Sequence, residues 1–208
     1  MFYGVTVPEE RRVAQKYRDT PLSELQKLLN HKVHECRLTA LFILVDQYKR
    51  ADNLEKKKIV LFYLKNAKRV NNWDLVDSSA SYVLGDYLVN HSPAGGKKIL
   101  YKLAKSKNMW KRRIAIVATG SFIGAGEFRH TLAITSILLK DTEDLLHKAC
   151  GWMLREVGKK DVKTLEVFLT RYASRMPRTM LRYAIERLSE QKRRRYLAID
   201  SIKLQRNK

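Results

Sequence analysis

The chain has 208 residues, 45% of them apolar, and 42 Lys+Arg against 21 Asp+Glu give a formal net charge of +21. This apolar content excludes a disordered chain, 9 Gly and 4 Pro are too few for the many tight turns of an all-β protein, and the longest apolar stretch, LFILV, is too short to span a bilayer. The charge favours a polyanionic partner, most often nucleic acid, although a basic protein without such a partner is the alternative.

Two further features favour the cytoplasm. The first residues, MFYGVTVPEERR, lack the basic start and apolar run of a secretory signal. Cys36 and Cys150 are isolated and form no paired framework, which fits a reducing compartment. We therefore expect a cytoplasmic protein with no membrane association.

Apolar residues recur at spacings of three and four through nearly every segment, as in VHECRLTALFILVDQY at 33–48. Similar blocks follow in chain order at 54–70, 81–91, 96–106, 130–140, 144–158, 162–173 and 179–199. Pro and Gly fall between blocks, in VPEE, TPLS, NHSPAGG, FIGAGEF, VGKKD and RMPRT. The pattern predicts an all-α protein with short loops between its helices.

Four of the helical segments repeat. Aligning RLTALFIL, DSSASYVL, RIAIVATG and KACGWMLR places Arg37, Asp77, Arg113 and Lys148 in equivalent positions, 40, 36 and 35 residues apart. This is the period of two-helix HEAT-like repeats. We predict a right-handed superhelical array of such repeats, forming one domain over 1–208, with a basic terminal helix and tail at 190–208. The second helix of each pair would line a concave surface.

The four aligned residues would form a row along that surface, with three cations and one carboxylate. A basic row binds a phosphate backbone through counterion release, and the carboxylate of Asp77 would weaken that binding. Two interpretations of Asp77 stay open. It forms an ion pair with Arg113 that locks adjacent repeats together, or it has a chemical role.

Two tryptophans accompany the row. Trp73 lies four residues before Asp77, and Trp152 lies four residues after Lys148, so each shares a helix face with its neighbour. A single Trp is usually core, but an exposed indole attracts a cation by ~0.5–2 kcal/mol. Aromatic side chains, a carboxylate and phosphate-binding cations together favour recognition of a positively charged group on nucleic acid. Alkylated purines such as 3-methyladenine and 7-methylguanine are cationic, whereas ordinary bases are neutral.

These residues also carry a family resemblance. NNWDLVDSSA, NMWKRRIAIV and LLHKACGWMLREVGK resemble the AlkD-type DNA alkylation repair glycosylases, which are built from HEAT-like repeats, and FYGVTVPEERR resembles the segment before their first full repeat. The resemblance covers about residues 2–195. It implies that Trp73, Asp77, Arg113 and Trp152 occupy the active-site cleft. The chain departs from the family at one place: it begins almost at the FYG segment, so we expect the family's N-terminal helices to be absent from it.

The expected activity is hydrolysis of the N-glycosidic bond of cationic alkylpurines in duplex DNA, as a monofunctional glycosylase in base excision repair. Asp77 would stabilise the oxocarbenium-like sugar and position water, and the two tryptophans would hold the lesion. Arg113 would grip the neighbouring phosphate and set the geometry of Asp77. The resemblance implies excision without a base-specific pocket. We expect no metal or organic cofactor and a monomer; the alternative is a non-catalytic repeat module that binds nucleic acid or an acidic protein.

Further cations complete the expected DNA interface. Arg37, Arg112 and Lys148 would contact phosphates from the inner helices, and Lys97 and Lys98 would do so from the PAGGKK loop, beside a helix N-terminus. His31 and His34 are three residues apart, as metal ligands can be, but we interpret them as surface histidines near a helix start. The arginines at 193–195 are expected on a solvated or DNA-facing edge.

Overall fold

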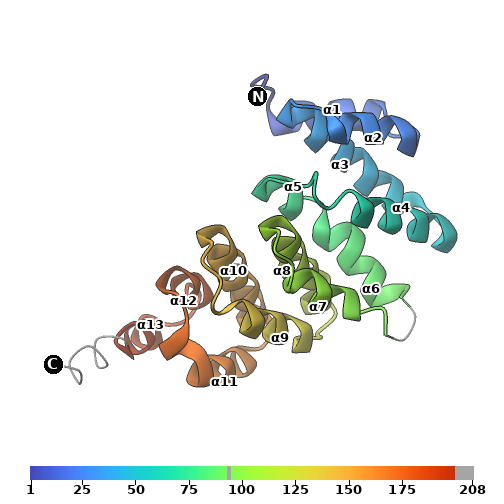
Figure 1. The fold of residues 1–208 in the computed structure, drawn as a ribbon. Coiled ribbons are helices and arrows are strands. Elements are labelled where there is room, and N and C mark those ends of the chain that lie inside the picture. The colour runs from blue at the N-terminus through green and yellow to red at the C-terminus, as the bar shows by residue number, and fades with distance from the viewer. Residues whose placement is uncertain (93–94, 200–208) are drawn as a thin grey trace. The chain divides into compact units, whose positions relative to one another are not determined.

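The computed structural model describes residues 1–92 and 95–199, and within these ranges the regular structure is entirely helical (Figure 1). This confirms the predicted all-α, helical-repeat fold. None of the helices within residues 1–92 and 95–199 has the length and the apolar content that a membrane-spanning helix needs.

The contacts divide the chain into two compact units, Met1–Ser121 and Phe122–Lys208, which we describe separately. The extent of the predicted repeat domain, 1–208, stays a prediction. Of its predicted basic terminus, α13 covers Glu190–Leu197, and 200–208 lie outside the described residues.

The first unit is built around one buried helix. Its helices are α1 (Val7–Lys16), α2 (Leu22–Asn30), α3 (His34–Arg50), α4 (Asn53–Lys65), α5 (Trp73–Asp77), the π-helix η1 (Ser81–Gly85), α6 (Asp86–Asn90), α7 (Lys98–Ala104) and the start of α8 (Met109–Gly124). Helix α3 packs against α1, α2, α4, α5 and η1, which is why apolar residues surround most of its circumference. Its side chains Leu41, Ile43, Leu44 and Tyr48 form the centre of this core.

Local signals explain the start of α1, although Pro8 in VPEE had predicted a break between helices there. Thr6 and Glu9 form a capping box, in which the Thr6 backbone N–H donates to Glu9 Oε2 at 3.0 Å. Pro8 lies in the first turn, where a helix does not need the missing N–H. The proline therefore begins a helix rather than separating two.

Three other predicted blocks differ from the structure, and one of them, 179–199, contains two helices, Arg178–Ala184 and Glu190–Leu197. The block 54–70 contains α4, which ends at Lys65. The block 81–91 is not one α-helix, because η1 precedes α6. The apolar spacing continues through both places, so it could not show the change in backbone hydrogen bonding.

The π-helix lies directly against α8. A Cβ at Gly85 would come within 2.2 Å of the Ala118 carbonyl oxygen, so only glycine permits this approach. The Ser121 hydroxyl donates to the Ser81 carbonyl at 2.7 Å and reinforces it. This contact fixes the segment that follows α5 against the helix that carries Arg113.

The second unit contains the end of α8 and five further helical elements. These are α9 (Arg129–Leu138), α10 (Asp144–Lys160), α11 (Val162–Tyr172) with the 3-10 turn η2 (Ala173–Arg175), α12 (Arg178–Ala184) and α13 (Glu190–Leu197). Helices α10 and α12 pack side by side (Figure 1). A Cβ at Gly151 would meet the Met180 carbonyl oxygen and the Tyr183 Cβ, both at 2.5 Å. A glycine thus permits close helix packing in each unit.

Candidate functional site

Helix α5 presents Trp73 and Asp77 on one face, as predicted. Asn72 caps the helix, since its side chain accepts the Trp73 backbone N–H at 2.8 Å. Trp73 is 53% exposed, so it is not a core residue. Asp77 follows four residues later, at the end of the helix, and the two side chains therefore share a face.

Asp77 and Arg113 form a bidentate ion pair between α5 and α8. Arg113 Nε donates to Asp77 Oδ1 at 3.0 Å, and Nη2 donates to Oδ2 at 2.7 Å. The Arg113 side chain is 5% exposed, and that of Asp77 is 20% exposed. Burial raises the pKa of Asp77 above its usual range, and the hydrogen bonds and charge of Arg113 oppose that rise. The pair holds a carboxylate in one orientation while leaving part of it accessible.

This geometry agrees with one of the two interpretations of Asp77 and is compatible with the other. The fork joins α5 to α8, as an ion pair between repeats would. It also orients the carboxylate, which a chemical role requires. Contact between Arg113 and a DNA phosphate stays a prediction, as do the roles of both residues in catalysis.

A second contact anchors α5 to α3. His34 Nε2 lies 2.6 Å from Asp74 Oδ2, and the His34 backbone N–H donates to the Met1 carbonyl at 3.0 Å. The Phe2 ring packs on the His34 ring, with centroids 4.9 Å apart. His34 is buried, so its interpretation as a surface histidine was wrong, whereas His31 is exposed. The separation of 40 residues between His34 and Asp74 equals that between Arg37 and Asp77, a signal that the sequence contained.

The predicted phosphate contacts Arg37 and Arg112 share one structural role. Arg37 Nη1 donates to the carbonyls of His31 and Lys32 at 3.0 and 3.1 Å. Arg112 Nη1 donates to those of Ser106 and Lys107, both at 3.0 Å. Each arginine thus binds the carbonyls six and five residues before it, in the loop that precedes its own helix. Their binding to DNA stays a prediction.

The same contact between a helix side chain and a loop carbonyl occurs in the second unit, and it shows that the repeats align in a different register from the one predicted. His147 Nε2 lies 2.6 Å from the Asp141 carbonyl oxygen, again six residues earlier. By these contacts Arg37 is equivalent to Arg112 and His147. The alignment had instead placed it with Arg113 and Lys148. The row of equivalent residues is therefore shifted by one position at Arg37, because apolar spacing alone does not distinguish adjacent register choices.

Trp152 and Lys148 lie one turn apart on α10, in the second unit. Lys148 Nζ forms a 2.8 Å ion pair with Asp144 Oδ2, four residues earlier, with 42% of the lysine side chain exposed. Trp152 is partly exposed. Both side chains lie on the same helix face, and their roles in lesion and phosphate binding stay predictions.

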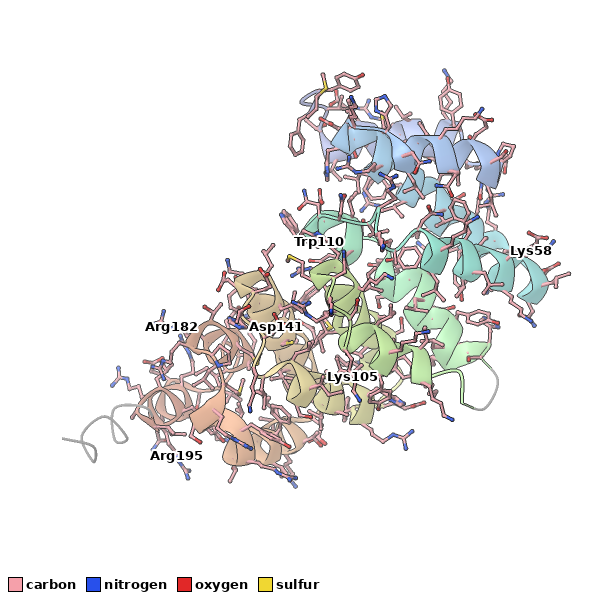
Figure 2. The ribbon with its side chains drawn as sticks, viewed as in Figure 1. Lys58, Lys105, Trp110, Asp141, Arg182 and Arg195 are labelled. Atoms are coloured by element: carbon pink, nitrogen blue, oxygen red, sulfur yellow. The ribbon has the colours of Figure 1, made fainter. Side chains whose placement is uncertain are left out.

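The remaining predicted cations are at α7 and α13. Lys97 is the N-cap of α7, Lys98 is its exposed first residue, and Pro93 and Ala94 of the PAGGKK loop lie outside the described residues. Arg193 and Arg194 pair with Glu190 on α13. Arg195 is exposed on the same helix, where Figure 2 labels it. The exposure of Arg194 and Arg195 agrees with the solvated edge expected for 193–195, and the DNA contacts of Lys97 and Lys98 stay predictions.

One aromatic residue was not assigned from the sequence. Trp110 lies in the first turn of α8, where Figure 2 labels it, and is partly exposed. It precedes Arg113 by three residues and so lies on the same side of α8. A related signal in the sequence could have identified it, because a Trp three residues from a charged residue shares a helix face with it, as the Trp residues at a spacing of four do.

Comparisons with known proteins bear on the family and the fold of the chain. A family model described as "DNA alkylation repair enzyme" matches residues 1–188. A solved structure described as "Predicted DNA alkylation repair enzyme from Enterococcus faecalis" is 17% identical, with a TM-score of 0.68, covering 91% of this chain and 89% of that one.

Two structures from Streptococcus mutans are also similar. AlkD2 is 18% identical with a TM-score of 0.57, covering 95% of this chain and 89% of its own, and smu.31 is 18% identical with a TM-score of 0.57, covering 93% and 91%. At these identities the structures show the fold alone. A search of the curated proteins found no match. Because the family model spans most of the sequence, the chain belongs to the DNA alkylation repair enzyme family.

Proposed function

We propose that this chain is a monofunctional DNA glycosylase that hydrolyses the N-glycosidic bond of cationic alkylpurines in duplex DNA, in base excision repair. The observation that carries the proposal is the carboxylate of Asp77, held by the Arg113 fork, partly accessible, and one turn from the exposed indole of Trp73. Membership of a DNA alkylation repair family supports the substrate class.

The reaction needs little help at the leaving group. As the bond between C1′ and the base nitrogen breaks, its electron pair neutralises the cationic purine, so no general acid is required. Positive charge develops on the sugar, where a nearby carboxylate stabilises it electrostatically. Water then forms the new bond at C1′ and loses its proton, leaving an abasic site. In this scheme Asp77 stabilises the sugar and orients the water.

The other site residues support that step. Arg113 positions Asp77 through both of its carboxylate oxygens, and its hydrogen bonds and charge oppose the rise in the pKa of Asp77 that burial causes. Trp73 and Trp152 would hold the lesion nucleotide by aromatic contacts with its sugar and cationic base. The phosphates would be held by the cations of the two units, Arg37, Arg112, Lys148, Lys97 and Lys98.

The decisive experiment measures release of 7-methylguanine from a defined duplex under single-turnover conditions. Asp77→Asn is compared with the parent and with Asp19→Asn, a matched change at an exposed carboxylate paired with Arg50. We expect Asp77→Asn to slow release about 10²–10³-fold, as for loss of one preorganised charge-stabilising group, and Asp19→Asn to match the parent. Release at the parental rate by Asp77→Asn would overturn the assignment.

Selectivity gives a second test. A protein that relies on the positive charge of the lesion should excise 7-methylguanine and 3-methyladenine but act poorly on neutral 1,N6-ethenoadenine. Strand cleavage at the product should require added heat or alkali if the enzyme is monofunctional. Equal excision of the neutral lesion would contradict recognition by charge.

The buried fork also favours a second candidate, a non-catalytic DNA-binding repeat module in which Asp77 only locks α5 to α8. This candidate predicts no base release by the parent, with DNA affinity that falls steeply as salt rises. It further predicts that Asp77→Asn lowers the melting temperature and weakens binding together. The glycosylase predicts loss of chemistry with DNA binding retained.

A further inference from the structure

The first unit contains a pocket of about 410 Å³ between α1, α2 and α3. Its walls are mainly apolar and come from Val13 on α1, Leu28 on α2 and Ile43 on α3, with Tyr3 and Tyr17 adding aromatic rings. This volume is within the range of small-molecule sites in proteins. Neither Asp77 nor Trp73 lines the pocket, so it is separate from the site described above.

Two carboxylates also line this pocket. Glu10 from α1 is 3% exposed, and Glu35 from α3 is 6% exposed. Glu35 Oε1 accepts the backbone N–H groups of Tyr3 and Gly4, both at 2.7 Å. The second oxygen of each carboxylate, Oε2, is buried and has no hydrogen-bond partner among residues 1–92 and 95–199. Buried polar atoms in native proteins are normally paired, so this arrangement calls for a donor.

The charge around these carboxylates is unbalanced. Within the described ranges, no lysine or arginine forms an ion pair with Glu10 or Glu35, although the chain has a net charge of +21. Burial, followed by the negative charges of Glu35 and Asp74, raises the pKa of Glu10 to about 7. A cation placed beside Glu10 would relieve this repulsion and supply the missing donors.

The chemistry of the pocket selects among possible ligands. An anion would meet two carboxylates, and a wholly apolar ligand would leave their oxygens unpaired at a cost of about 1–3 kcal/mol each. A metal ion prefers several oxygen or nitrogen ligands, and the described residues contain no cluster of three or more potential metal ligands. An organic cation satisfies both the carboxylates and the apolar walls, and tyrosine rings favour such a charge.

We propose that this pocket binds a small organic monocation, an ammonium or amidinium group on an aromatic or aliphatic frame. The cationic N–H groups donate to Glu10 and Glu35, and the frame packs against the tyrosines and aliphatic side chains. The pocket is thus a second binding site, and it does not depend on the proposed glycosylase activity.

The test uses benzamidine as the probe and benzamide as a neutral molecule of the same shape, each titrated into the full-length protein by calorimetry. We expect saturable binding of benzamidine in the millimolar range or tighter, and binding of benzamide at least tenfold weaker. Glu10→Gln should weaken benzamidine at least tenfold. Glu24→Gln, on the exposed side of α2, makes the same charge change away from the pocket and should leave affinity unchanged.

A second variant protects the test against misfolding. Val13 is 46% exposed at the pocket, so Val13→Phe fills the space without altering the core. It should abolish benzamidine binding while far-UV circular dichroism stays as in the parent. The proposal is overturned if the parent shows no saturable binding, if benzamide binds as well as benzamidine, or if Val13→Phe and a folded Glu10→Gln both bind like the parent.

Discussion

In the first unit Asp77 and Arg113 form a buried fork between α5 and α8, whereas in the second unit Lys148 pairs with Asp144 along the surface of α10. Both pairs have short N···O distances, 2.7 and 2.8 Å, so distance does not distinguish them. Burial does. Removing one partner of a buried pair leaves an uncompensated charge in a poorly solvated place, and removing an exposed partner leaves a charge in water.

The comparison extends to packing. In each unit a glycine brings two segments into close contact, Gly85 against α8 and Gly151 against α12. In each unit, too, a helix side chain forms a hydrogen bond with the loop carbonyl six residues before it. The units thus share their construction. They differ in where charge is buried: the first unit buries Arg113, Glu10, Glu35 and His34, so its energetics depend on specific polar partners.

The largest expected effect comes from breaking the buried fork. Arg113→Ala should lower the free energy of unfolding by about 3–5 kcal/mol, because Asp77 loses both donors. Lys148→Ala, the matched change at the surface pair, should cost no more than about 1 kcal/mol. Urea denaturation of both variants measures the difference. Similar losses for the two would mean that burial does not separate the two pairs.

The second contact of α5 should come next. His34→Ala removes the partner of the Asp74 carboxylate and the ring beneath Phe2, at an expected cost of about 1.5–3 kcal/mol for a hydrogen bond to a charged group. The exposed neighbour His31→Ala serves as the control, with a change within about 0.5 kcal/mol. A thermal melt of both proteins suffices. If His34 holds α5 in place, 7-methylguanine release should also slow in His34→Ala alone.

The glycine contacts provide a comparison between the units. Gly85→Ala and Gly151→Ala should each destabilise by about 1–3 kcal/mol, because the added Cβ meets backbone atoms of the neighbouring segment. Gly124→Ala is the control, since a Cβ there has open space and alanine favours the helix. Unfolding curves that show Gly85→Ala as stable as Gly124→Ala would contradict the close contact between η1 and α8.

The smallest effect concerns Glu10 and pH. Its pKa in the folded protein, about 7, lies above the ordinary 4.5, so the folded state binds this proton more tightly than the unfolded chain does. The resulting stability is present below pH 4.5 and is lost as pH rises through 7. Between pH 4.5 and 8, the free energy of unfolding of Glu10→Gln should therefore fall by about 1–2 kcal/mol less than that of the parent.

Urea titrations of both proteins at several pH values test this. Identical pH profiles would show that Glu10 titrates normally. The exposed variant Glu24→Gln supplies the baseline for loss of one carboxylate.

Much of the fold and part of the site could be predicted from the sequence. Spacings of three and four identify helices because side chains at these intervals share a face, and this local rule holds wherever the helix packs. The separation of 36 residues between Asp77 and Arg113 made an ion pair between repeats one of two open interpretations. The spacing of four residues predicted that Trp73 and Asp77 share a face, whereas the exposure of Trp73 was decided by tertiary packing.

Other features were decided by tertiary packing. The sequence predicted that His34 and Arg37 lie on a helix and that Glu10 lies in a break, and it determined the partners of none of the three. Arg37 binds loop carbonyls, His34 meets Asp74 across 40 residues, and Glu10 is buried against α3. A charged side chain on a helix can reach a carbonyl, a carboxylate or water at similar local cost, so periodicity cannot choose among them. The neighbouring helices make that choice, because they decide which polar groups are removed from water and must find a partner.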